Sequence, residues 1–394
     1  MTSSSAPSRN PRVRIFTGAR GIPFVINIAL TQSLVFLLRP TITYRGLELG
    51  LDNFQVGLVG IAFAVLPLIL AVPSGSLVDR VGERKILGGA SIAMLLTSLV
   101  LLTTHNVFWL VVGSALLGLA QLGAVVAQQA LVSNQPASVD RNAAFGYYTL
   151  WISLGQVFGP LVITWIGGDA LIPNTQLLFA IAVVASLPLI VASFLVHGSG
   201  THRDQANVDT TTTMELLRIH GVLRGIVASA FIISAIDIIV IYLPALGHER
   251  GYSSGLVGAV IALRSGASMV TRLGLGRLAA RFGRPLLMTV SAFVAAAVFF
   301  IVAFPVPPWM LVVFGIVAGF GLGVGQPLMM AWVADVAPAG VRGKASGMRL
   351  FANRLAIIAI PAAAGWVSGS MGASVVFAGV GLILVVSGSL TVKE

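Results

Sequence analysis

Cysteine is absent from the 394 residues, so disulfide bonds and thiol chemistry are excluded and the redox compartment is left undetermined. Charge is scarce as well: 9% of the residues are charged, whereas soluble domains carry about a quarter. Hydrophobic residues make up 57% of the chain. A soluble globular domain is therefore excluded, and most of the chain is predicted to lie in lipid.

Other chemical signatures are missing too. The five histidines lie at the ends of apolar runs or in polar segments without metal-ligand spacing, so no metal site is expected. No Walker pattern occurs, and the glycine-rich segments lack the strand and helix context of a nucleotide loop, which argues against ATP as the energy source. No motif combines a nucleophile, a base and an orienting residue. The sequence therefore indicates neither an enzyme nor a cofactor.

Apolar runs of about 20 residues, long enough to cross a hydrocarbon core of about 30 Å, recur along the chain. Alternating ten-residue patterns of barrel strands are absent, so each run is predicted to be a helix. The predicted fold class is an all-α polytopic membrane protein with twelve spans, at 22–39, 55–73, 86–104, 107–131, 144–166, 176–196, 222–245, 255–275, 286–304, 309–335, 347–368 and 372–391.

The net charge of +11 could indicate a nucleic-acid partner, but the distribution of charge argues against one. If residues 1–20 are cytoplasmic, most arginines and lysines fall in inner loops, and the outer loops hold only Arg39, Arg45 and Arg250. This positive-inside pattern predicts a protein of the plasma (inner) membrane with both termini in the cytoplasm and no nucleic-acid partner. Residues 1–20 lack an apolar h-region and are predicted to be a tail rather than a signal peptide.

The chain is predicted to contain two copies of one six-helix design. A constant offset of 201 residues relates Glu48 to Glu249, Gly118 to Gly319, Arg141 to Arg342 and Pro160 to Pro361. An even number of spans in each copy gives parallel repeats, with the substrate site between them. A duplicated bundle without transport, such as a receptor or scramblase, is the alternative. The predicted domains are a tail at 1–20, six-helix bundles at 21–197 and 221–394, and a cytoplasmic linker at 198–220.

The stretch GSLVDRVGERK at 75–85 concentrates charge in an apolar chain. It resembles the cytoplasmic loop between the second and third helices of the major facilitator superfamily, whose pattern is Gly-x-Leu-x-Asp-Arg-x-Gly-x-Arg-Lys. The second copy, GRLAARFGRPL at 276–286, keeps the frame but has Ala280 in place of Asp79. With the twelve spans and the repeat, the resemblance covers nearly the whole chain. It implies a secondary transporter that works by alternating access.

The charged loop has two parts with different expected roles. Its glycines suit a tight reversal and its basic residues suit inner anchors, whereas the carboxylate of Asp79 needs a partner at the edge of the low-dielectric region. The resemblance implies a conformational latch between Asp79 and the start of the eleventh helix, either Arg349 or the helix N-terminus. The predicted latch residues are Gly75, Asp79, Arg80, Gly82, Arg84 and Arg349.

Asp237 is the one carboxylate predicted well inside a span. A buried carboxylate loads and releases a proton when its surroundings change, so Asp237 is the predicted proton-coupling residue, with Arg264 or Arg354 as its paired cation. A static ion pair that only ties C-terminal helices together is the alternative. The resemblance implies a cavity lined by the first, fourth, seventh and tenth helices. The predicted cavity residues, taken from these and neighbouring spans, are Asn27, Gln32, Gln121, Gln156, Asp237, Arg264, Gln326 and Asn353.

The direction of transport is indicated by GQVFGPLVITWIGG, which partly resembles the drug-exporter signature Gly-x-x-x-Gly-Pro-x-x-Gly-Gly. Gly155, Gly159 and Pro160 match, but Ile163 and Thr164 replace the last two glycines. The sequence predicts a monomer in the lipid bilayer that exports small amphiphilic organic molecules in exchange for protons. The alternatives are proton-coupled uptake of an organic anion held by Arg264 and Arg354, and a non-transporting membrane sensor or lipid-handling protein.

Overall fold

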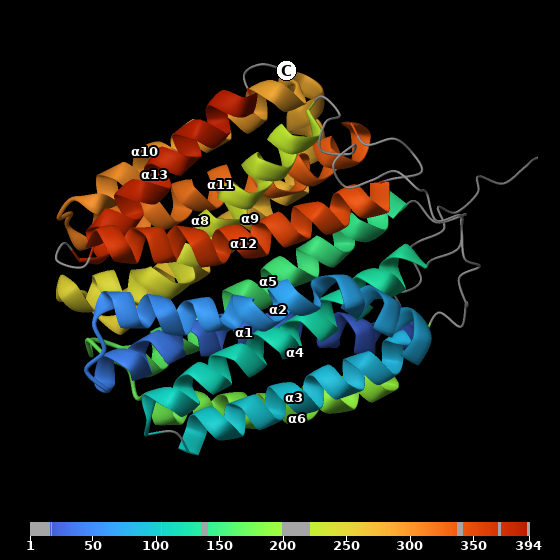
Figure 1. The fold of residues 1–394 in the computed structure, drawn as a ribbon, viewed down its shortest axis with the longest axis horizontal. Helices are drawn as coiled ribbons and strands as arrows, with labels where there is room; N and C mark the ends of the chain where they lie inside the picture. The colour runs from blue at the N-terminus through green and yellow to red at the C-terminus, as the bar shows by residue number, and fades with distance from the viewer. Residues whose placement is uncertain are drawn as a thin grey trace, which may run out of the picture.

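The computed structural model describes residue 16 and residues 18–103, 105–134, 141–198, 221–336, 342–368 and 372–391. These residues form twelve long helices and no strand, which confirms the all-α class (Figure 1). In chain order the helices are α1 (Gly18–Glu48), α2 (Asn53–Val81), α3 (Glu83–Thr103), α4 (Val107–Ser133), α5 (Arg141–Gly167), α6 (Thr175–Leu195), α8 (Val222–Glu249), α9 (Ser254–Phe282), α10 (Arg284–Ala303), α11 (Pro308–Val336), α12 (Arg342–Ser368) and α13 (Ala373–Thr391).

The helices belong in a membrane. Within the described residues, eleven of them are long and apolar enough to span one, and α12 adds a shorter apolar segment, Phe351–Ile360. Large apolar side chains also point outward: Ile69 is 66% exposed, Val184 65% and Leu382 60%. Such exposure is unfavourable in water and expected against lipid tails, while the helices satisfy their backbone hydrogen bonds internally.

The turns after α2 and α9 explain why glycine recurs at positions 82 and 283. Gly82 ends α2 with a φ of 91°, and α3 starts at the next residue. Gly283 ends α9 with a φ of 79°, and α10 likewise starts at once. Residues other than glycine rarely adopt such positive φ values. The frame around 75–85 and 276–286 therefore serves the same backbone reversal in both halves.

The helices form two six-helix bundles with matching internal contacts (Figure 1). In the N-terminal bundle α1 packs on α5 and α6, α4 packs on α2 and α3, and α3 packs on α6. In the C-terminal bundle α8 packs on α12 and α13, α11 packs on α9 and α10, and α10 packs on α13. Each contact has its counterpart when α1–α6 are matched in order with α8–α13. The bundles meet through α5 with α9, α2 with α12, and α1 with α8.

The offset of 201 residues is also visible in the packing. A side chain at Gly118 of α4 would collide with the backbone carbonyl of Phe63 in α2. A side chain at Gly319 of α11 would collide with the backbone carbonyl of Arg264 in α9. Because 118 and 319, like 63 and 264, differ by 201, the same close helix approach occurs in both bundles.

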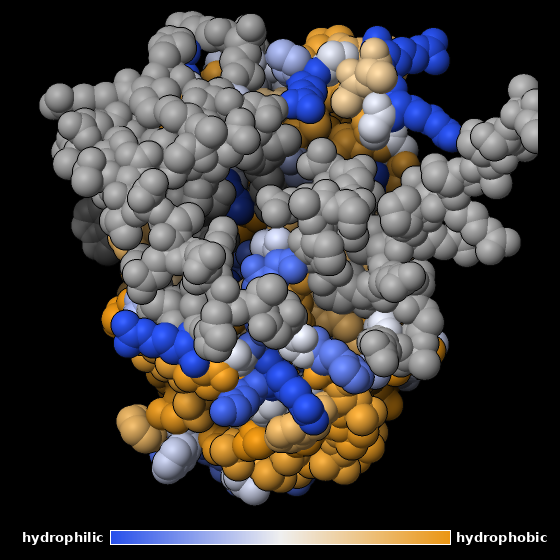
Figure 2. Space-filling model, turned by 90° about the vertical axis from the view of Figure 1, so that its right-hand side faces the viewer, coloured by the Kyte–Doolittle hydropathy of each residue, from blue (hydrophilic) through white to orange (hydrophobic). Residues whose placement is uncertain are grey.

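The molecule has two chemically different ends. We call the end where α6 stops and α8 starts the linker end, on the right of Figure 1, and the opposite end the far end. Figure 2 looks onto the linker end, where hydrophilic side chains gather while hydrophobic ones cover the flank of the lower, N-terminal bundle. The exposed basic residues at the linker end include Arg80, Arg84, Lys85, Arg277, Arg281 and Arg284.

Candidate functional site

An ion pair joins the two bundles. Asp237 of α8 accepts a hydrogen bond from Nη1 of Arg39 in α1, and the two side chains are 13% and 6% exposed. The predicted partner, Arg264 or Arg354, is therefore wrong for the direct contact. The static alternative is not met either, because the pair connects different bundles rather than the C-terminal helices alone.

Arg39 was expected in an outer loop, and that expectation is also wrong. The predicted span ends at Arg39, next to Pro40, but α1 continues through both residues to Glu48. Arg39 and Arg45 are buried, at 6% and 8% exposure. Each guanidinium lies against an aromatic ring, at 4.2 Å from the centroid of Phe63 for Arg39, which offsets part of the cost of burying the charge.

Arg264 and Arg354 make no ion pair among the described residues, and Arg354 is half-buried. Arg264 is 1% exposed, its Nη2 donates to Ser265 Oγ at 2.7 Å, and its Nε is buried without a partner. Its guanidinium carbon lies 5.8 Å from the ring centroid of Phe36. The charge of Asp237 acts on both Arg264 and Arg354. The charge of Arg272 in α9 also acts on Arg264, more strongly than that of Asp237 does. Arg39, Asp237, Arg264 and Arg354 are therefore linked through the charge of Asp237, with a further positive charge near Arg264.

We call Arg39, Asp237, Arg264 and Arg354 the central charge cluster. Three guanidinium groups face one carboxylate, so the cluster carries a net charge of +2 (three positive charges less one negative). Because each buried charge without a counter-charge is costly, this excess is a candidate binding feature rather than a stabilising one. Arg39 is the member that the sequence missed. Nothing local in the sequence marks it, because Pro40 follows it directly and its partner Asp237 lies in the other bundle.

Asp237 and Arg264 are members of this cluster, and two further predicted cavity residues, Asn353 and Gln32, lie near its members in the chain. Asn353 precedes Arg354 in α12, is 5% exposed, and its Oδ1 accepts a hydrogen bond from Ser229 Oγ of α8 at 3.4 Å. Gln32 in α1 is 4% exposed, one helical turn before Phe36. Gln121 of α4 has a buried Oε1 without a partner among the described residues, and Gln156 of α5 is half-buried.

Asn27 does not occupy a cavity position. It is 1% exposed, its Nδ2 donates to Ser193 Oγ at 2.8 Å, and its Oδ1 accepts from Gln128 Nε2 at 2.7 Å. Tyr148 extends this network by donating to Gln128 Oε1 at 3.3 Å. The amide of Asn27 is thus satisfied inside the N-terminal bundle, because its face of α1 turns towards α4 and α6 rather than towards α8.

The predicted latch is described only in part. Arg80 and Arg84 are exposed at the linker end, and Gly82 makes the turn described above. Arg349 of α12 is 7% exposed and makes no ion pair with a described carboxylate. The side chains of Asp79 and Gln326 and the surroundings of Gly75 lie outside what the structure describes, so the contact between Asp79 and Arg349 stays a prediction.

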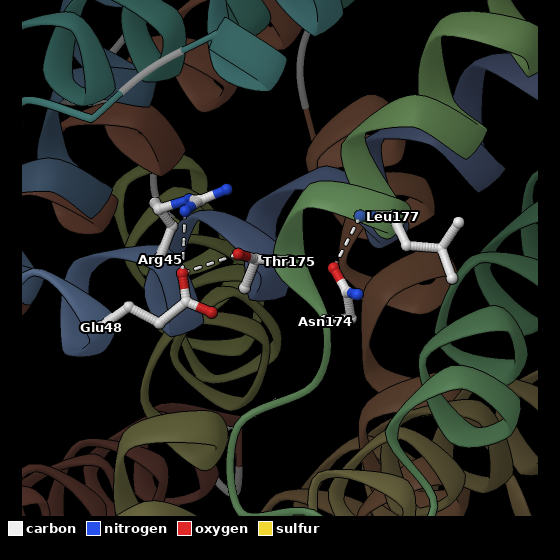
Figure 3. Close-up of polar contacts among 5 residues, drawn as sticks. All are labelled: Arg45, Glu48, Asn174, Thr175 and Leu177. Atoms are coloured by element: carbon white, nitrogen blue, oxygen red, sulfur yellow. Dashed lines mark hydrogen bonds and ion pairs between the residues drawn. The ribbon is translucent and has the colours of Figure 1, made fainter.

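The far end holds a pair of related glutamates. Glu48 accepts a hydrogen bond from Thr175 Oγ1 at 2.7 Å and pairs with Arg45 at 3.0 Å, while Asn174 caps α6 at Leu177 N (Figure 3). Its counterpart Glu249 accepts from the backbone N of Ala373 at 3.1 Å. Each glutamate therefore holds the start of the last helix in its own bundle.

Contacts between the bundles close the far end. Asn53 of α2 donates to Glu249, Ser254 Oγ of α9 donates to the carbonyl of Ala170 at 2.7 Å, and Gly255 N donates to the carbonyl of Gly168 at 3.2 Å. We call these three hydrogen bonds the far-end gate. Nearer the linker end, Arg272 of α9 donates to Ser153 Oγ at 2.7 Å and to the carbonyl of Thr149 at 3.3 Å, both in α5.

Comparison with known proteins agrees with this architecture. The family model described as Major Facilitator Superfamily matches residues 24–308 and 226–393. An MFS-type transporter of Yersinia pestis is 26% identical over 328 residues, which cover 80% of this chain and 78% of the relative. A multi-drug resistance efflux pump PmrA homolog of Lactococcus lactis is 23% identical over 309 residues, with 74% and 73% covered.

A solved structure shares the fold. The crystal structure of a mutant of the nucleoside transporter NupG superposes with a TM-score of 0.75 at 14% sequence identity, covering 94% of this chain and 98% of that one. At this identity the likeness concerns the arrangement of the helices and not the substrate.

Proposed function

Because the chain belongs to the Major Facilitator Superfamily and is a transporter rather than an enzyme, we propose that it couples substrate transport to protons. The protein is an integral membrane protein, and it carries a small-molecule substrate. We further propose that it acts as a monomer in the inner membrane with the linker end in the cytoplasm. The exposed basic residues at that end support this orientation.

The observation that carries the proposal is the ion pair between Arg39 and Asp237. Protonation of Asp237 removes its charge and leaves Arg39 without a counter-charge, which weakens the contact between α1 and α8. A proton bound at Asp237 therefore favours a different arrangement of the two bundles from the one that the ion pair favours. This links proton binding to the rocking motion that alternating access requires.

Two directions of transport have support. Export of small amphiphilic organic molecules is supported by the likeness to the efflux pump homolog of Lactococcus lactis. The glycines of the exporter-like signature do not decide the direction, because Gly155 and Gly159 let α5 pack against the backbone of α1. Proton-coupled uptake of an organic anion is supported by the excess of arginine in the central charge cluster.

The test uses purified protein in liposomes that contain the pH-sensitive dye pyranine. Candidate substrates are added outside as benzoate, benzenesulfonate, benzamide, benzylamine and ethidium. A substrate exchanged for protons makes the lumen more alkaline, whereas a substrate carried with protons acidifies it. Benzoate and benzylamine also cross the bilayer in their uncharged forms, so the signal is taken as the difference from liposomes without protein. Asp237→Asn should abolish this difference, and Asp169→Asn, which changes an exposed far-end carboxylate, should not. A signal that persists in Asp237→Asn would count against proton coupling through this residue.

A further inference from the structure

We infer that the substrate is an organic anion whose charged group binds Arg264 and Arg354, and that it binds together with a proton on Asp237. The inference rests on the proposed proton-coupled transport and names the substrate class for the central charge cluster. It favours uptake with protons over exchange against them.

The central charge cluster has more positive charges than negative ones. Arg39 already takes the single carboxylate of the cluster, so Arg264 and Arg354 have no counter-charge among the described residues. Burying an unpaired guanidinium is costly, and proteins retain such groups where a ligand supplies the missing charge. An anionic ligand lowers the energy of this cluster, whereas a cationic ligand raises it.

Two guanidinium nitrogens of the central charge cluster have no hydrogen-bond acceptor. Nε of Arg264 and Nη2 of Arg39 are buried and have no hydrogen-bond partner. A guanidinium presents parallel donors that match the oxygens of a carboxylate, sulfonate or phosphate. The donors left unsatisfied in this structure therefore fit an oxyanion.

The aromatic rings beside the arginines indicate the apolar part of the ligand. Phe36 and Phe63 lie against the guanidinium groups of Arg264 and Arg39, and both rings are buried. An aromatic or apolar body is expected beside them, since rings and guanidinium planes stack favourably with such groups. The ligand class is thus an amphiphilic organic acid with an apolar body and one charged head group.

The link to protons follows from the same four residues. The charges that face Asp237 are Arg39 from α1, Arg264 from α9 and Arg354 from α12, and the described parts of α11 and α13 place no charged side chain against it. A bound anion engages these arginines and so weakens their hold on the ionised carboxylate. Proton and anion therefore favour each other's binding, and the effect is reciprocal.

The experiment measures binding to the purified full-length chain by thermal unfolding. Benzoate and benzenesulfonate are compared with benzamide and benzylamine, which have the same ring without the negative charge. The two anions should raise the unfolding temperature in a concentration-dependent way, and the neutral and cationic compounds should not. Benzenesulfonate stays ionised between pH 5 and pH 8, so tighter binding at the lower pH reports protonation of the protein.

Variants locate the site. Arg264→Gln and Arg354→Gln should each weaken benzenesulfonate binding about ten-fold or more, since each removes a charge-assisted hydrogen bond. Arg264→Lys provides a second variant if the glutamine variant does not fold. Arg277→Gln, an exposed linker-end arginine, is the matched control and should bind as the wild type does. Asp237→Asn should bind the anion at least as tightly as the wild type and without dependence on pH.

Three results would overturn the inference: stabilisation by benzylamine equal to that by benzoate, no stabilisation by either anion, or unchanged binding in both glutamine variants. The outcome is separable from the proposed function. Proton movement driven by benzylamine would keep proton coupling and reject the anionic substrate. Anion binding that depends on Arg264, with proton movement unchanged in Asp237→Asn, would keep the anion site and reject the coupling role of Asp237.

Discussion

At corresponding positions the two bundles carry different chemistry. Phe36 and Phe63 of the N-terminal bundle match Asp237 and Arg264 of the C-terminal bundle at the offset of 201 residues. The charged and aromatic members then meet across the interface, because Arg264 lies against Phe36. The helix packing around them is the same in both bundles. The repeat thus preserves the backbone frame while one copy alone carries the carboxylate.

The N-terminal bundle contributes a charge of its own at another position. Arg39 has Val240 as its counterpart in α8, so the cross-bundle ion pair has no second copy. A symmetric protein would have two such pairs or none. The difference concentrates the titratable chemistry in one place on the interface, where a single proton changes the contact between both bundles.

The largest expected effect comes from removing this asymmetry at Asp237. Asp237→Asn leaves Arg39 buried without a counter-charge, and losing one partner of a buried pair costs about 3–5 kcal/mol. Both the unfolding temperature and proton-coupled transport should fall. The double variant Asp237→Asn/Arg39→Gln should regain much of the stability but none of the coupling. Thermal unfolding and the pyranine assay measure the two properties separately, and equal stability of single and double variants would contradict the role of the pair.

A second comparison concerns the two copies of the charged loop. We predict that Asp79→Ala slows transport about ten- to hundred-fold, since removing a charged hydrogen-bond partner costs about 1.5–3 kcal/mol. Ala280→Asp should have little effect. Initial rates of transport in proteoliposomes give the comparison. The latch interpretation would be rejected by equal rates in the wild type and Asp79→Ala, or by a loss in Ala280→Asp as large as that in Asp79→Ala.

How far the sequence predicts this molecule depends on which interactions are local. Helix length, the glycine turns at Gly82 and Gly283 and the offset of the repeat are local or periodic properties, and the structure contains them. Arg39 was missed because a charge followed by proline ends an apolar run, and only the distant carboxylate of Asp237 makes its burial favourable. Asn27 was misplaced because α1 is apolar on most sides, so its pattern does not tell which face meets α8.

The close helix approach at Gly118 and Gly319 occurs in both bundles, so changing it should lower stability by a similar and smaller amount in each. Gly118→Ala and Gly319→Ala each force a methyl group against a backbone carbonyl, and such overpacking costs about 1–3 kcal/mol. Both variants should lower the unfolding temperature by a similar amount. Gly146→Ala in α5 is the control, because nothing lies within 4 Å of the added carbon. A loss confined to one bundle would show that the two close approaches are not equivalent.

The smallest effect separates Glu48 from Glu249. Both hold the start of the last helix in their bundle, so Glu249→Gln should cost about 0.5–1.5 kcal/mol of stability. Glu48→Gln should cost more, because it also removes the counter-charge of the buried Arg45. Glu249 also accepts from Asn53 across the far-end gate, so only its variant should open that gate more often. Thr43 of α1 is 4% exposed and donates to the carbonyl of Ile241 across the bundles. Because the chain contains no cysteine, a single Thr43→Cys exchange reports opening of the far end through its rate of maleimide labelling.

The labelling rate at Thr43→Cys should rise about two- to five-fold in Glu249→Gln, which corresponds to a shift of about 0.4–1 kcal/mol in the opening equilibrium, and stay unchanged in Glu48→Gln. Asn53→Ala provides the matched check, since it removes the same cross-bundle hydrogen bond from the other side and leaves the contact of Glu249 with Ala373 intact. Equal labelling of the Glu48 and Glu249 variants would mean that the hydrogen bond to Asn53 does not hold the far end closed. The gate would then rest on the hydrogen bonds that Ser254 and Gly255 donate to the carbonyls of Ala170 and Gly168, in the turn after α5.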